Sequence, residues 1–98
     1  MPARKSSRLS VEILNESTTL TLSEVCRSCG ADSHFVYELV QEGVIRPRGK
    51  RVHEWVFDGI AVTRIQRAYR MHRDLQVNLP GIALALELLD RMEQIRRR

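Results

Sequence analysis

The sequence has few of the features that mark several common classes of protein. Among its 98 residues, two are cysteines and five are aromatic. Two cysteines are too few for a disulfide scaffold, and no apolar run approaches the ~20 residues that a membrane span requires. There is no Gly-rich phosphate loop, and no Ser–His–Asp or Cys–His set is recognisable. We therefore expect a non-enzymatic protein that uses no cofactor or metal and does not insert into a membrane.

The length allows one domain with a modest, mainly aliphatic core. Residues 1–8 are polar and basic, so we expect a disordered tail there and no signal peptide. Residues 9–98 form the expected domain. It comprises short strands in 9–20, a helix-turn-helix with a wing in 21–57, and a two-helix part in 58–98. A cytoplasmic location is the simplest expectation.

The helix-turn-helix is predicted from signals for helix starts and ends. Thr21 and Glu24 have the spacing of a capping box, and Gly30 is a typical residue at a helix end. Asp32 is the predicted cap of the second helix, over residues 33–42. Spacing at i, i+3 and i+4 gives that helix one apolar face, made of Val36, Leu39 and Val40.

A small hairpin is predicted next. Residues 44–47 and 52–57 flank the turn at 48–51, and the pattern favours the wing of a winged helix. Trp55 and Phe57 alternate along the second segment, so their side chains share one face. Core packing is the main interpretation for both, and an interface role for Trp55 is the alternative.

The first of two longer C-terminal helices is predicted to begin after Asp58, its cap, and to run to about residue 75. His72 falls on its apolar face, where we expect a packed, hydrogen-bonded histidine. Arginines recur every three residues and sweep around its polar side: Arg64, Arg67, Arg70 and Arg73.

The second of these helices is predicted to start near Pro80, in its first turn. Its apolar arc is wider than the usual ~100° stripe, which indicates that more than one surface covers it. We expect a homodimer, because exposed rows of Leu and Ile are usually covered. The expected dimer face consists of Leu84, Leu88 and Ile95.

Two cysteines form the spacing Cys26-x-x-Cys29, which is half of a metal or redox motif. A metal would need two more ligands, and the three histidines stand at no recognised spacing from the pair. Redox activity would need a βαβ setting, which the pattern lacks. We therefore expect buried or partly buried thiols.

Charge is unevenly distributed in the predicted winged helix. The net charge of +4 permits nucleic-acid binding without requiring it. A basic loop could contact phosphates, with a solvated loop as the alternative; it comprises Arg46, Arg48, Lys50 and Arg51. The helix at 33–42 has no Arg or Lys, and its carboxylates would be repelled by DNA. We interpret it as a protein-binding face, with a solvated face as the alternative. The candidate contacts are Asp32, Phe35, Tyr37, Glu38, Gln41 and Glu42.

Four motifs, in this order and spacing, resemble one family. They are W-V-F-D at 55–58, Q-R-A-x-R at 66–70, H-x-x-L at 72–75 and P-G-I-A-x-A-L at 80–86. They are similar to the bacterial chaperone modulators of the CbpM type. The part up to residue 57, including G-V-I-x-P at 43–47, also resembles the MerR-type winged helix. The resemblance implies a mainly α fold: a MerR-like winged helix-turn-helix with a small β wing and two longer C-terminal helices.

The resemblance also implies a function. Proteins of this family bind and restrain a J-domain co-chaperone, the curved-DNA-binding DnaJ homologue, which would also bring them to the nucleoid. J-domains present a basic helix to their Hsp70, and an acidic face matches that charge. The alternative is a MerR-like DNA-binding transcriptional regulator. In DNA-binding MerR relatives the positions of His34 and Tyr37 are typically arginine, and this chain departs from that pattern.

Overall fold

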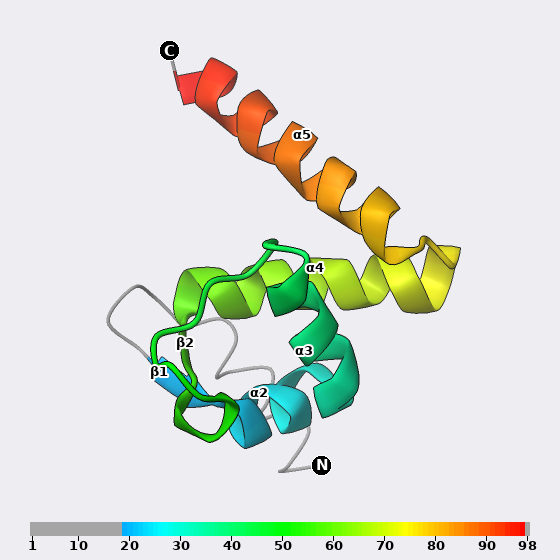
Figure 1. Cartoon of the computed structure of the whole chain (residues 1–98). Coiled ribbons are helices and arrows are strands. Elements are labelled where there is room, and N and C mark those ends of the chain that lie inside the picture. Colours follow the sequence, from blue (N-terminus) through cyan, green and yellow to red (C-terminus); the bar gives the residue numbers. More distant parts are fainter. Residues whose placement is uncertain (1–18, 98) are drawn as a thin grey trace, which may run out of the picture.

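Helices account for most of the chain, and a small sheet links the two short helices to the two long ones (Figure 1). The structure is a computed structural model that describes residues 19–97. The predicted tail and the part of the predicted strands at 9–18 lie outside this range. The elements, in order, are β1 (Thr19–Thr21), α2 (Leu22–Cys29), α3 (Ser33–Gln41), a 3-10 turn (Val52–Glu54), β2 (Val56–Asp58), α4 (Gly59–Leu75) and α5 (Leu79–Arg97). The predicted fold class is confirmed.

The predicted caps begin three of the helices. Thr21 and Glu24 form the full capping box, in which the Thr21 Oγ1 accepts from the Glu24 N–H at 3.2 Å and the Glu24 carboxylate accepts from the Thr21 N–H at 2.8 Å. Asp32 and Asp58 each accept a backbone N–H three residues on, at 2.8 Å. Such a cap contributes ~0.5–2 kcal/mol. Gly30, at φ 79°, ends α2 in the left-handed conformation that glycine tolerates.

The two strands pair in antiparallel fashion, with Leu20 opposite Phe57. Each strand runs directly into a helix, so α2 and α4 leave the sheet from opposite ends. This contact between residues far apart in the sequence joins the helix-turn-helix to the long helices. Strand β1 overlaps the last two residues of the segment predicted to contain short strands, 9–20.

The predicted hairpin wing is wrong in detail. The predicted first arm, residues 44–47, forms no strand. An isolated antiparallel bridge instead joins Arg48, in the predicted turn, to Val56, with N···O distances of 3.0 and 3.1 Å. Val52–Glu54 is a 3-10 turn instead of a strand. The ladder does not extend beyond this pair, because residues 45–47 are not in a strand. Gly49 folds so tightly onto the turn that a Cβ there would lie 2.5 Å from a carbonyl oxygen.

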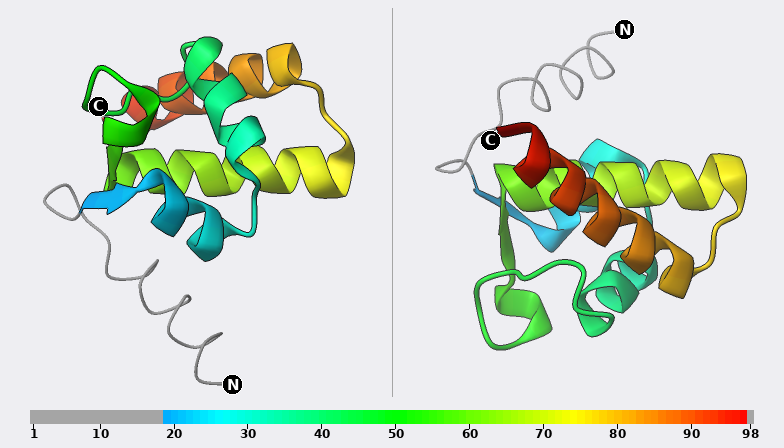
Figure 2. Two further views of the ribbon diagram at one scale, coloured as in Figure 1. Left: turned by 60° about the horizontal axis from the view of Figure 1, so that its bottom comes forward. Right: turned by 90° about the horizontal axis from the view of Figure 1, so that it is seen from above.

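The core lies between α4 and the elements around it. Figure 2 shows α5 crossing α4 on the side away from α2. Burying one large aliphatic or aromatic side chain contributes about 1.5–3 kcal/mol. The largest fully buried side chains come from every layer and are Phe57, Leu39, Ile45, Ile65, Ile82, Leu86, Val25, Val36 and Val62.

Helix α5 is anchored to this core only near its start. Ile82 and Leu86 are its buried residues, and every residue from Glu87 to Arg97 is exposed. In Figure 1 the C-terminal half of α5 stands clear of the other elements. Among residues 19–97, every helix is too short or too polar to cross a bilayer.

Candidate protein-binding site

The outer face of α3 carries most of the residues expected to meet a partner. Tyr37, Gln41 and Glu42 are exposed, and the Glu38 side chain retains 41% of its accessibility. The His34 Nε2 lies 3.3 Å from the Glu38 carboxylate one turn away. No lysine or arginine lies in α3, so its accessible surface is acidic.

Two of the expected contact residues, Asp32 and Phe35, have structural roles instead. The Asp32 carboxylate caps α3 by accepting the Phe35 N–H. The Phe35 side chain is only 8% exposed and packs in the core, with its ring centroid 5.7 Å from that of Tyr69 and 5.0 Å from that of His72. Phe35 lies one turn before the buried Leu39, so it points inward with it. The accessible face of α3 therefore lacks Phe35.

Tyr37 packs against Trp55, the residue that follows the 3-10 turn. Its ring stacks on Trp55 with centroids 6.0 Å apart and planes 21° apart. Trp55 is 7% exposed and contacts Phe57 edge-on at 6.1 Å, which confirms the predicted core packing of both residues. Tyr37 is thus a largely fixed aromatic surface beside the acidic residues. Nothing in the local sequence pattern indicated this contact.

The basic loop is exposed, as both of its interpretations require. Its four cationic side chains all lie at the surface between α3 and β2: Arg46, Arg48, Lys50 and Arg51. The loop and α3 therefore present opposite charges in neighbouring parts of the module.

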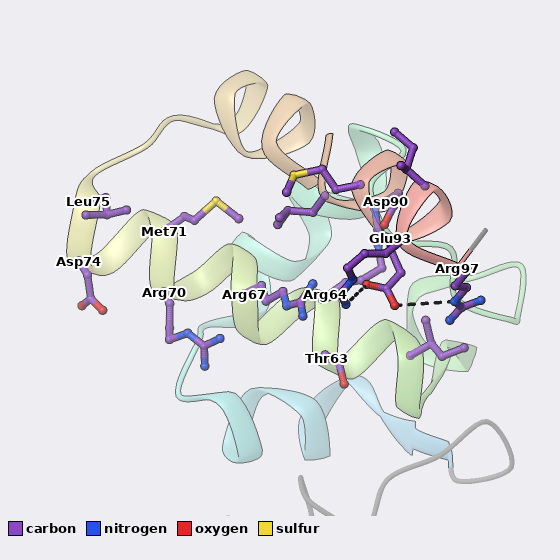
Figure 3. Close-up of a pocket in the computed structure, with 15 residues that line it drawn as sticks. Thr63, Arg64, Arg67, Arg70, Met71, Asp74, Leu75, Asp90, Glu93 and Arg97 are labelled. Atoms are coloured by element: carbon purple, nitrogen blue, oxygen red, sulfur yellow. Dashed lines mark hydrogen bonds and ion pairs between the residues drawn. The ribbon is translucent and has the colours of Figure 1, made fainter. Parts of the chain in front are cut away.

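Arg64 has a structural role that the sequence did not reveal. Its Nε donates to the Val44 carbonyl oxygen at 3.2 Å, and its Nη1 donates to both carboxylate oxygens of Asp90 at 2.8 and 2.9 Å (Figure 3). The side chain therefore ties the segment after α3 to α5. It was predicted to lie among solvated arginines.

His72 is exposed, so the prediction of a packed position is only partly right. One side of its ring contacts Phe35. The rest faces solvent because the last turn of α4, residues 72–75, is exposed. Next to it, the Arg73 guanidinium lies 5.5 Å from the Tyr69 ring centroid and donates to Asp74 at 2.7 Å. The hydrogen bond from Arg73 lowers the pKa of Asp74.

The two thiols are partly buried, as predicted. Burial, aided by the neighbouring Cys26, raises the pKa of Cys29 to about 11. Burial, followed by the Asp32 carboxylate, raises the pKa of Cys26. Both thiols are therefore protonated near neutral pH, which disfavours nucleophilic and metal-binding roles. Within residues 19–97, no three or more His, Cys, Asp or Glu side chains are grouped to hold a metal.

The residues of the expected dimer face are accessible. Leu84, Leu88 and Ile95 are 57%, 50% and 70% exposed along one side of α5. At 100° per residue they form a single ridge, opposite the buried Ile82 and Leu86. The ridge is therefore accessible to another surface.

Comparisons with known proteins agree with this architecture. The family described as MerR HTH family regulatory protein matches residues 20–98. The chaperone modulatory protein CbpM of Pseudomonas entomophila is 36% identical over 77 residues, which cover 79% of this chain and 76% of that protein. CbpM of Coxiella burnetii is 34% identical over 86 residues, covering 88% and 81%. CbpM of Pseudomonas putida is 35% identical over 77 residues, covering 79% and 76%. The chain therefore belongs to the family of the chaperone modulatory proteins CbpM, built on the helix-turn-helix of the MerR regulators.

Proposed function

We propose that this protein is a non-enzymatic chaperone modulator that acts in the cytoplasm. It binds the J-domain of a DnaJ-like, curved-DNA-binding co-chaperone and inhibits its co-chaperone activity. The names of the relatives support a chaperone-modulating role. The acidic, lysine- and arginine-free outer face of α3 is the observation that carries the choice of partner. A J-domain offers a basic helix to Hsp70, and this face has the complementary charge.

The geometry of α3 supports a docking surface of this kind. Glu38 and Glu42 lie one turn apart, so both carboxylates can meet one partner helix. Tyr37 adds an apolar contact that Trp55 already orders, so little side-chain entropy is lost on binding. Each exposed charge is worth only ~0.2–1 kcal/mol, so the acidic residues mainly steer association and Tyr37 supplies the anchor. Covering the basic helix excludes Hsp70, which makes inhibition a steric consequence.

The proposal includes a homodimer through α5. The apolar ridge of Leu84, Leu88 and Ile95 provides the contact.

A MerR-like DNA-binding regulator is the second candidate, and the exposed basic loop favours it. The composition of α3, the helix that would enter the major groove, argues against DNA binding. Base readout relies on Arg, Lys, Asn and Gln, and α3 offers Gln41 with two glutamates beside it. Phosphate contact through the loop alone gives weak binding without sequence preference.

The test is a titration of a purified J-domain with this protein by calorimetry, at two salt concentrations. Reversal of the acidic face in Glu38→Lys/Glu42→Lys should weaken binding and slow association, because like charges then meet. The charge-matched control is Glu87→Lys/Glu93→Lys, which places the same change on exposed residues of α5. A second assay follows J-domain-stimulated ATP hydrolysis by Hsp70, which the wild type should suppress and the α3 variant should suppress less.

Three results would count against the proposal. Absence of wild-type binding would remove the J-domain as partner. Binding unchanged by the α3 reversal and by salt would remove α3 as the interface, and loss in the control variant would move the interface to α5. A nanomolar footprint on one promoter at physiological salt would favour the regulator.

A further inference from the structure

A second surface, formed by α4 and α5, has a different character from the α3 face. The two helices diverge and leave an open groove of about 1200 Å³ between them (Figure 3). Figure 3 shows Met71 on the side of α4 that faces α5. Six apolar side chains line the groove: Ile60, Met71, Leu75, Leu89, Met92 and Ile95. Leu75 and Met92 are 71% and 61% exposed, so this lining is available to a partner.

The dimensions of the groove favour a polypeptide segment. Pockets for small ligands enclose about 300–1,000 Å³ and bury most of the ligand. This groove is larger and open along one side. A helix with its side chains is about 10–12 Å across, and an apolar stripe from such a helix is what a groove between two helices usually accepts.

The unpaired charges that line the groove determine which charge a partner must carry. Its carboxylates are already engaged with arginines: Asp90 with Arg64 at 2.8 Å, Glu93 with Arg96 at 2.7 Å and Asp74 with Arg73 at 2.7 Å. Arg67 and Arg70 also line the groove, and neither side chain forms an ion pair or hydrogen bond with another residue in the range 19–97. The uncommitted charge is therefore positive.

We propose that the α4–α5 groove binds an amphipathic helix of a partner protein whose apolar stripe is flanked by carboxylates. The stripe would contact the methionines and leucines, and the carboxylates would meet Arg67 and Arg70. Methionine suits such a surface because its side chain adapts to different apolar partners. The groove takes an acidic helix where the α3 face takes a basic one, so the protein joins two segments of opposite charge.

The groove and the dimer ridge lie on different sides of α5. Leu88 belongs to the ridge and Leu89 to the groove, and successive residues of a helix are separated by 100°. Ile95, near the open end, borders both surfaces. A dimer through the ridge therefore leaves most of the groove accessible. The proposal does not depend on binding of a J-domain at α3.

The experiment uses two labelled synthetic peptides of about 20 residues, which span roughly 30 Å as helices. Both carry leucines at i, i+3, i+4 and i+7, and one has glutamates beside the stripe where the other has lysines. Fluorescence anisotropy should show that the full-length protein prefers the glutamate peptide by at least about tenfold, or ~1.4 kcal/mol. Arg67→Glu/Arg70→Glu should reverse this preference, and Met92→Glu should weaken binding of the glutamate peptide.

The matched control is Arg48→Glu/Lys50→Glu, which makes the same charge change in the exposed basic loop and should leave the preference intact. Methyl NMR of methionine-labelled protein locates the site, because Met71 and Met92 are two of the three methionines. Their signals, assigned with Met71→Leu and Met92→Leu, should shift with the glutamate peptide. Circular dichroism confirms that each variant is folded.

Several outcomes would overturn the proposal. Equal binding of the two peptides, or no shift at either methionine, would show that the groove does not select an acidic helix. Peptide binding that dissociates a homodimer would make the groove an interface between two copies of this chain. Failure to bind the peptide, combined with binding to anionic phosphatidylglycerol vesicles that the double arginine variant loses, would assign the groove to a membrane surface. The J-domain titration of Glu38→Lys/Glu42→Lys is unaffected by any of these results.

Discussion

Arg64 on α4 and Asp90 on α5, 26 residues apart in the sequence, form an ion pair in which one guanidinium nitrogen donates to both carboxylate oxygens, at 2.8 and 2.9 Å. The same side chain also donates to the Val44 carbonyl at 3.2 Å. The Arg64 side chain is 25% exposed and that of Asp90 is 54% exposed. Arg64 therefore links α4 to α5 beyond the last buried residue of α5, Leu86.

Replacing Arg64 should lower the stability of the protein more than replacing Asp90. Arg64→Ala should lower the free energy of unfolding by about 1–2 kcal/mol, because a charged hydrogen bond to a carbonyl is lost together with the ion pair. Asp90→Asn should cost only ~0.2–1 kcal/mol, since the pair is largely exposed. Urea unfolding followed by circular dichroism measures both, with the exposed Arg67→Ala as control, expected within ~0.5 kcal/mol of wild type. Equal losses in the first two variants would mean that the Val44 bond adds nothing.

The raised pKa of Cys29 gives stability a defined pH dependence. The pKa is 9.0 for an unperturbed thiol and about 11 in the folded protein, where burial disfavours the thiolate. The folded state then holds this proton more tightly than the unfolded state. The contribution is complete below pH 9 and is lost as the pH rises toward 11.

Unfolding in urea below pH 9 and near pH 11 tests this dependence. The wild type should lose more stability over the interval than Cys29→Ala, which shares all other titrating groups. Identical pH profiles would show that Cys29 is not the source.

Alkylation of Cys29 near neutral pH should also be slow, since the thiolate is scarce. Cys26→Ser/Cys29→Ala should leave J-domain binding nearly intact. The finding of stoichiometric zinc in the wild type, lost in this variant, would contradict the interpretation of the two cysteines as thiols without a metal-binding role.

The proposed homodimer should depend on the apolar ridge of α5. Leu88→Glu places a charge in the middle of the contact and should shift the protein toward monomer in equilibrium sedimentation at micromolar concentration. Val52→Glu is the matched control, since Val52 is an exposed apolar residue of the wing turn, at 42%. A wild type that is monomeric, and that Leu88→Glu leaves unaltered, would remove the dimer.

Binding to duplex DNA should be weak and strongly dependent on salt. If the four cations of the basic loop neutralise four phosphates, the slope of log K against log salt is about −3.6, and a fourfold rise in salt weakens binding roughly a hundredfold. Arg48→Glu/Lys50→Glu should remove most of this binding on every sequence alike. Retention of one sequence at physiological salt would point to base readout and contradict the prediction.

Local signals predicted the helices well, because each rests on residues close in sequence. Thr21, Asp32 and Asp58 accept backbone N–H groups three residues on, and Gly30 ends α2. Such contacts are independent of the rest of the fold. The alternation of Trp55 and Phe57 likewise located their burial, since a strand has only two faces.

Contacts between distant segments were not predictable in the same way. Strand β2 pairs along its length with β1, which is distant in the sequence, whereas the predicted hairpin contributes only the bridge between Arg48 and Val56. Phe35 was assigned to the surface and His72 to a packed position, because the sequence pattern does not show where α3 crosses α4 and which side chains it covers. Arg64 repeats with its neighbours at a spacing that indicates solvent, and only the angle between α4 and α5 brings Asp90 to it.

The stacking of Tyr37 on Trp55 gives the protein an intrinsic optical reporter. Trp55 is the only tryptophan in the chain, and its indole lies beneath the exposed ring at the acidic face of α3. A ligand that displaces or covers Tyr37 changes the polarity around the indole, and its emission with it. The groove is lined by α4 and α5 and includes neither residue, so occupation of that surface leaves the emission constant. One unlabelled fluorescence spectrum therefore distinguishes which of the two surfaces a partner has occupied.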